Sequence, residues 1–115
     1  MNKEIIKNKL EEFLELKDNW DGYKSSSFNK EFIDKCMGFI TGTDSFNLPQ
    51  PDIIPFSGGI QFEWISGGKE LEIEIQKDGK NIGFLQIFPN KKMKEGKINL
   101  ENKEEVNYPF LKEWA

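Results

Sequence analysis

A chain of 115 residues, 37% hydrophobic and 13% aromatic, has the size of one domain and enough apolar area to bury a core, which argues against a disordered polypeptide. Its 20 acidic residues outnumber 16 basic ones, so no concentrated basic face for nucleic-acid phosphates is expected. No stretch approaches the roughly 20 apolar residues of a membrane span, and the charged first residues contain no apolar signal core. We therefore expect a cytoplasmic protein that binds neither nucleic acid directly nor a membrane.

Residues 1–40 predict a helical hairpin. Between Lys3 and Lys17, apolar residues recur every three or four positions and charged residues fill the other face, which is the pattern of an amphipathic helix. The Asn, Asp and Gly residues of segment 18–23 end this helix because they favour turns. A second apolar stripe predicts a helix from about Asn29 to Ile40, with Ser27 or Asn29 as its N-cap.

Residues 52–100 predict an antiparallel sheet of about four to five strands. Pro55 makes segment 52–56 an edge strand, because proline cannot donate to a sheet ladder. Further along the chain, apolar and polar residues alternate, with turns at Gly67-Gly68 and at Asp78-Gly79, a pair that type I′ hairpins favour. Tight turns set a register that puts all the following pairs on one face: Trp64 with Leu71, Phe62 with Ile73, Ile75 with Ile82, and Ile73 with Phe84.

Two features of the last third leave alternatives open. Leu85 and Ile87 fall on the face opposite the apolar one, so either a bulge follows Phe84 or that second face is partly covered. A last short strand is predicted at Lys97–Leu100 after a turn at Glu95-Gly96, and residues 101–115 form a C-terminal tail. The expected fold is α+β within a single domain, 1–115, with two N-terminal helices packed on one face of the sheet.

Catalytic and metal chemistry has few suitable residues in this sequence. The chain has no histidine, which removes the commonest general base, the commonest metal ligand and every Ser-His or Cys-His pair. Its single cysteine, Cys36, excludes an intramolecular disulfide and the usual zinc sites, and its apolar neighbours predict a buried, inert thiol. We predict no catalytic residue, no metal ligand set and no cofactor.

The expected register gathers four glutamates on the face opposite the apolar one. Glu63 lies opposite Glu72, with Glu70 and Glu74 beside them, so like charges are neighbours and repel each other. Three interpretations are open: a solvated face, a site for a basic surface of another protein, or a carboxylate–metal hydrolase site. In the first, three nearby lysines compensate the charge: Lys69, Lys77 and Lys80. We take the four glutamates as the candidate partner-binding residues of a non-enzymatic module.

The loop Asn19–Tyr23 is an alternative candidate site. Trp20 and Tyr23 flank Asp21-Gly22, which would suit a small ring-bearing or cationic ligand such as a nucleotide or metabolite. The structural interpretation is that Trp20 fills the helix–sheet interface while Asp21 stabilises the turn. The sequence also leaves open a homodimer formed through the edge strand near Pro55, if that edge is free.

Several of these segments together resemble a broad group of small bacterial and phage proteins. The resemblance rests on Asn19-Trp20-Asp21-Gly22-Tyr23, on Pro49, Pro51 and Pro55, on Gly58–Trp64 and on Leu71–Ile75. That group pairs an Asn-Trp-Asp-Gly-Tyr-Gly-Ala motif with a Gly-rich turn and a Glu-Trp strand; here Lys24-Ser25 replaces Gly-Ala. The resemblance implies no activity. The chain is more loosely similar to phage-encoded anti-defence, anti-CRISPR-like accessory proteins, which implies an inhibitor that occupies a basic surface of a defence nuclease.

Overall fold

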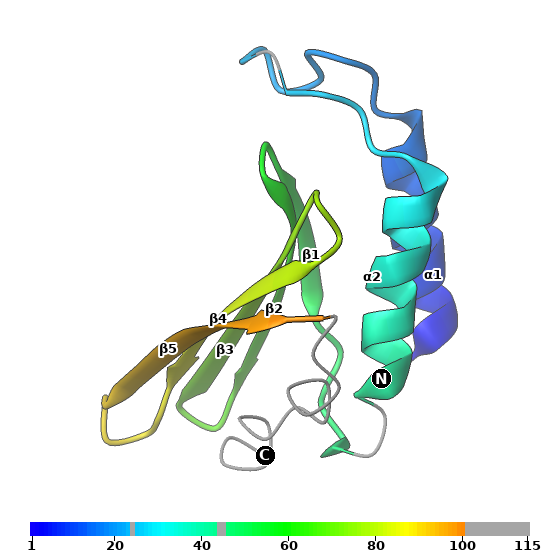
Figure 1. Ribbon diagram of the computed structural model, residues 1–115. Coiled ribbons are helices and arrows are strands. Elements are labelled where there is room, and N and C mark those ends of the chain that lie inside the picture. Colours follow the sequence, from blue (N-terminus) through cyan, green and yellow to red (C-terminus); the bar gives the residue numbers. More distant parts are fainter. Residues whose placement is uncertain (24, 44–45, 101–115) are drawn as a thin grey trace.

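The computed structural model describes residues 1–23, 25–43 and 46–100, and it shows a helical layer packed on a five-stranded sheet (Figure 1). The strands pair antiparallel in chain order, β1-β2-β3-β4-β5. The predicted α+β class is therefore confirmed, while the predicted tail, 101–115, lies outside the described residues. The elements are α1 (Lys3–Glu12), the 3-10 helix η1 (Phe13–Glu15), α2 (Lys30–Gly42), β1 (Asp52–Phe56), β2 (Gly59–Ser66), β3 (Lys69–Gln76), β4 (Asn81–Ile87) and β5 (Met93–Asn99).

The first helix is shorter than predicted. Asn2 caps its start, since the Asn2 side chain accepts hydrogen bonds from the backbone N–H groups of Glu4 and Ile5. Regular α-helix ends at Glu12 instead of Lys17, because the chain tightens into η1 and then becomes extended at Leu16, where ψ is 122°. No helix in the described ranges is long and apolar enough to cross a membrane.

The second helix begins as predicted and continues further. Its N-cap is Asn29, whose Oδ1 accepts the Phe32 N–H at 2.8 Å, so of the two predicted caps the structure selects Asn29. It extends two residues beyond Ile40, to Gly42. The backbone N–H and the hydroxyl of the buried Thr43 both donate to the Ile40 carbonyl, at 3.0 and 2.7 Å, and satisfy this carbonyl at the helix end.

Both helices lie on the same face of the sheet (Figure 1). Phe39 of α2 meets Phe62 of β2 with ring centroids 6.5 Å apart, and the Trp64 indole N–H donates to the Pro49 carbonyl at 2.8 Å. Seven of the eight predicted apolar sheet residues have no exposed surface, and Phe84 is half-buried. The seven are Ile60, Phe62, Trp64, Leu71, Ile73, Ile75 and Ile82. These side chains form the sheet's half of the core, and buried residues of α1 and α2 form the other half.

The register of β2, β3 and β4 agrees with the prediction. Trp64 pairs with Leu71, Phe62 with Ile73, Ile73 with Phe84 and Ile75 with Ile82. Gly67 and Gly68 have φ of 59° and 78°, the left-handed values that a type I′ turn needs at both central positions.

The Asp78-Gly79 turn departs from the predicted type I′ geometry. Of its two central residues only Gly79 has a positive φ, 68°, and its N–H donates to the Gln76 carbonyl at 2.9 Å. Asp78 keeps an ordinary negative φ because its carboxylate accepts the N–H groups of Lys80 and Asn81. These bonds also lower the pKa of the Asp78 carboxyl.

Strand β4 pairs with β3 without a bulge. Glu72 lies opposite Leu85 and Glu70 lies opposite Ile87, so the register continues unbroken beyond Phe84. Of the two alternatives left by the sequence, the structure therefore excludes the bulge. Leu85 and Ile87 lie on the face away from the helices.

The predicted turn at Glu95-Gly96 is wrong. The chain reverses earlier, between Phe88 and Lys92, where Lys91 has φ 65° and the Phe88 N–H donates to the Lys92 carbonyl at 2.9 Å. Gly96 instead lies inside β5, opposite Phe84. The Phe84 ring comes within 2.9 Å of where a Cβ at Gly96 would be, so a larger residue would collide with it. This glycine is required by close packing and not by a turn.

The core assignment predicts very different losses of stability for substitutions at two residues of β2. Phe62→Ala should lower the free energy of unfolding by about 3–5 kcal/mol, because it leaves a cavity beneath α2. Ile65→Ala, on the other face, should change it by no more than about 0.5 kcal/mol. Urea unfolding of both variants measures the difference, and equal losses would contradict the assignment of the two faces.

Candidate functional site

The candidate site is the sheet face turned away from α1 and α2, here called the outer face. No helix of the described residues covers it (Figure 1). The predicted glutamates all lie on it, in β2 and β3, and they alternate with the buried residues of the core. The side chains of the outer face that matter below are Asp52, Ile65, Glu63, Glu70, Glu72, Glu74, Leu85, Ile87, Met93, Glu95 and Lys97.

One row of directly opposed residues crosses the whole sheet. It runs from Asp52 through Glu63, Glu72 and Leu85 to Glu95, one residue from each strand. Four of the five side chains are carboxylates, and neighbouring strands lie about 4.8 Å apart. Leu85 is the exception and separates Glu72 from Glu95. The sheet therefore presents a line of negative charge from edge to edge.

Two members of this row are missed by sequence reasoning. Asp52 belongs to the row because β1 pairs in register with β2, and the sequence pattern alone leaves open how an edge strand aligns across Ser57-Gly58. Glu95 is missed because the sequence predicts a turn at Glu95-Gly96. Its alternation with Met93 and Lys97 is the signal that could have found it.

Repulsion between the glutamates is greatest at the centre of the row. The pKa of Glu72 is raised above its usual 4.5, first because its half-buried carboxyl is partly desolvated and then because Glu63, Glu74 and Glu70 are close by. The Lys77 N–H donates to the Gly58 carbonyl, and from this bond onward hydrogen-bonded and non-hydrogen-bonded residue pairs alternate along β2 and β3. Glu63–Glu72 is therefore a pair without mutual hydrogen bonds. Such pairs bring side chains closest together.

Of the three lysines expected to compensate the charge, Lys77 is placed differently from the expectation. Lys77 points to the loop before α2, where its ammonium donates to the Ser26 carbonyl at 2.7 Å and lies 4.7 Å from the centre of the Phe28 ring. The register does bring a different cation to the outer face, Lys97, which is in line with Glu74 across Gly83.

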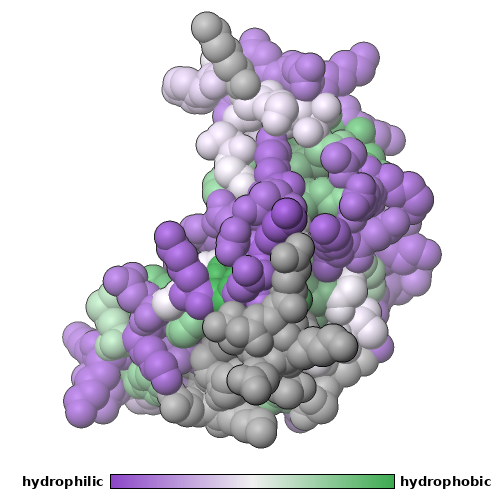
Figure 2. Space-filling model, in the orientation of Figure 1, coloured by the Kyte–Doolittle hydropathy of each residue, from purple (hydrophilic) through white to green (hydrophobic). Residues whose placement is uncertain are grey.

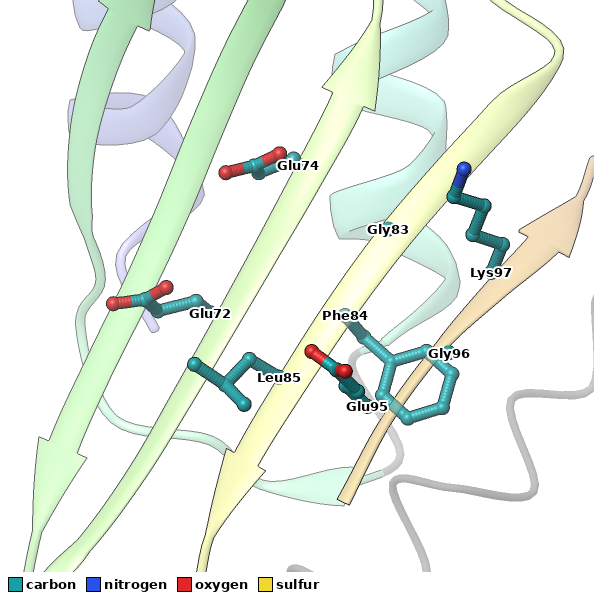
Figure 3. Close-up of a pocket in the computed structure, with 8 residues that line it drawn as sticks. All are labelled: Glu72, Glu74, Gly83, Phe84, Leu85, Glu95, Gly96 and Lys97. Carbon is teal, nitrogen blue, oxygen red and sulfur yellow. The ribbon is translucent and has the colours of Figure 1, made fainter. Parts of the chain in front are cut away.

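A hollow of ≈ 540 Å³ lies over β3, β4 and β5 on this face (Figure 3). Gly83 contributes no side chain, so the centre of the face is low there, while Glu72, Glu74, Leu85, Glu95 and Lys97 surround it. These surrounding residues are half-buried or exposed, which makes the hollow part of an open surface. Figure 2 shows hydrophilic and hydrophobic side chains intermixed over the part of the sheet near β4 and β5.

The carboxylates of this face do not converge. Within the described residues, no group of three or more Asp, Glu or Cys side chains is arranged to hold a metal ion. Side chains on one sheet face stand roughly parallel to one another, so their oxygens do not surround a single point. The carboxylate–metal hydrolase alternative thus has no ligand set in this part of the chain.

The Trp20 loop is held together by its own polar groups. The Asp21 carboxylate accepts hydrogen bonds from the N–H groups of Tyr23 and Ser25 and from the Ser25 hydroxyl. These bonds, the hydroxyl first, lower the pKa of Asp21. Trp20 is half-buried against Phe28, 5.9 Å between ring centroids, and its indole N–H donates to the Ser26 carbonyl.

The structure does not bring Trp20, Asp21 and Tyr23 together as one ligand platform. Tyr23 is 87% exposed, while Trp20 packs inward and Asp21 is occupied by backbone and hydroxyl donors.

Cys36 is likewise structural: burial raises the pKa of its thiol to about 12, which keeps it protonated and unreactive.

Comparison of the chain with protein-family models, with curated proteins and with solved structures found no match.

The crowding around Glu72 predicts a pH-dependent gain in stability. Glu72→Gln should raise the free energy of unfolding at about pH 7 by roughly 0.2–1 kcal/mol, because it removes a partly desolvated charge and its repulsion from directly opposed and adjacent carboxylates. A raised carboxyl pKa means that the folded state favours the protonated acid, so the ionised group destabilises the fold only above its pKa. The gain should therefore shrink as the pH falls through and below that pKa.

Urea unfolding of Glu72→Gln and of the unmodified protein, at about pH 7 and about pH 4, measures this difference. Glu11→Gln, on the exposed side of α1, is the matched control and should show no such pH-dependent gain. A loss of stability at pH 7 in Glu72→Gln would contradict the proposed repulsion.

Proposed function

We propose that this protein is a non-enzymatic binding module whose outer face docks on a basic surface of another protein. The observation that carries the proposal is the row of Asp52, Glu63, Glu72 and Glu95 on a sheet face that no described helix covers. Burial first and then the neighbouring glutamates raise the pKa of Glu72, and cationic side chains of a partner would relieve the repulsive part of this cost. The free protein thus gives up some stability that a complex would recover.

Apolar side chains beside the acidic row support docking of a protein in preference to a small cation. Ile65 and Met93 are 62% and 65% exposed, and Leu85 and Ile87 are half-buried next to Glu72 and Glu70. Protein interfaces combine apolar contacts with polar groups that set orientation. Charged residues would here steer association, and the apolar residues would supply buried area.

The basic partner that fits best is a nucleic-acid-binding enzyme. Such an enzyme concentrates Lys and Arg along the groove that holds phosphates, and a line of carboxylates across a sheet has the complementary charge. We therefore propose, as the finer form of the function, an inhibitor encoded by a phage or mobile element that occupies this groove in a host defence nuclease. The similarity to anti-defence accessory proteins supports this choice.

The proposal predicts that charge reversal at the centre of the row abolishes partner capture. Glu63→Lys with Glu72→Lys should reduce recovery of the partner from host lysate at least about tenfold, since two attractive contacts become repulsive. Quantitative affinity capture at low and high salt measures this effect, and capture by the unmodified protein should weaken with salt.

The matched control is Glu11→Lys with Glu15→Lys, which makes the same change in net charge on the exposed side of α1 and η1. This control should capture the partner as the unmodified protein does. Equal capture by both double variants, each shown by circular dichroism to be folded, would reject the outer face as the docking surface.

A further inference from the structure

The two edges of the sheet differ in their capacity to pair with another strand. In an antiparallel strand, alternate residues direct their N–H and C=O groups to opposite sides. The Lys77 N–H to Gly58 carbonyl bond fixes this alternation for β2 and, through it, for β1. The backbone groups of Ile53 and Pro55 point to the free side of β1, and Pro51 comes at the preceding position of this alternation. Two of these three positions lack an N–H, so the β1 edge is a poor template for pairing.

The β5 edge has no such protection. The Phe88 N–H donates to the Lys92 carbonyl at 2.9 Å, and the Leu100 N–H donates to the Lys80 carbonyl at 2.6 Å. Hydrogen-bonded pairs recur at every second residue between these bonds, so Phe84 and Gly96 are such a pair. Alternation therefore turns the backbone groups of Gly96 toward β4 and those of Glu95 and Lys97 to the free side. Among residues 1–23, 25–43 and 46–100, no strand pairs with that side.

We propose that β5 pairs antiparallel with β5 of a second copy of this chain, about a two-fold axis that passes beside Gly96. In that register Gly96 faces Gly96 of the second copy, and Glu95 faces Lys97 of the second copy on each side of the axis. The backbone groups of Glu95 and Lys97, which point outward, then bond to each other across the interface. The same strand thus serves both copies, as a two-fold interface requires.

Charge complementarity selects the second copy as the occupant of this edge. Glu95 and Lys97 both project from the outer face, on either side of a glycine, so the short sequence Glu-Gly-Lys is complementary to itself when reversed. Each dimer contains two directly opposed Glu–Lys pairs, and opposite charges at such positions stabilise strand pairing.

The resulting sheet has ten strands, and among the described strands its remaining edges are the two copies of β1, which are limited by their prolines. Pairing would stop at two copies and would not propagate. The inference does not depend on the proposed partner, because it rests on the backbone edge of β5; Glu95 alone belongs both to this edge and to the acidic row.

Charge exchange across the axis tests the dimer in the full chain. Sedimentation equilibrium should show a dimer for the unmodified protein and at least about tenfold weaker association for Glu95→Lys or Lys97→Glu, since both Glu–Lys pairs then become like-charged. The double variant Glu95→Lys/Lys97→Glu should dimerise again. An equimolar mixture of the two single variants should form a heterodimer, because each pair then joins a lysine to a glutamate.

Lys92→Glu, in the exposed turn before β5, is the matched control; it has the same net charge as Lys97→Glu and should dimerise like the unmodified protein. Circular dichroism establishes that each variant is folded. A monomer at concentrations up to about 1 mM overturns the proposal, and so does a dimer that all the charge variants leave unchanged.

Discussion

The two-residue turn at Gly67-Gly68 fixes the register of β2 against β3, and the properties of both sheet faces depend on that register. Its positive φ values at both positions make Ser66 face Lys69, and the pairs that follow put Trp64 on Leu71 and Glu63 on Glu72. A slip of one residue would turn every apolar side chain of one strand to the outer face. Burial of the core therefore forces the glutamates together.

The parts of the fold that the sequence predicts correctly are those in which local and long-range preferences agree. Asn29 caps α2 where a polar cap meets an apolar stripe, and the β2–β3–β4 register follows from alternation joined to tight turns. The errors occur where a residue type has two uses. Gly96 has the composition of a turn, yet it is a strand residue whose missing side chain makes room for the Phe84 ring, a contact visible only in three dimensions.

The candidate site is predictable from sequence in its centre but not at its ends. Glu63, Glu70, Glu72 and Glu74 follow from one hairpin, whereas Asp52 and Glu95 depend on how the two outermost strands align. The Trp20 loop shows a different limit, because sequence names its residues but not whether Asp21 faces a ligand or its own loop. A face with repelling carboxylates at its centre and a self-complementary edge at β5 gives one small sheet two surfaces for association, which share Glu95.

Disulfide formation between cysteines introduced at facing positions tests most directly whether Glu63 faces Glu72. Glu63→Cys/Glu72→Cys should form a disulfide in air, because directly opposed residues without mutual hydrogen bonds approach to about 4.5 Å between Cα atoms. Gln61→Cys/Glu72→Cys places the cysteines diagonally, about 7–8 Å apart, and should stay reduced. Mass spectrometry of the folded proteins distinguishes the two states. A disulfide in the diagonal variant alone would contradict the register and the acidic outer face that depends on it.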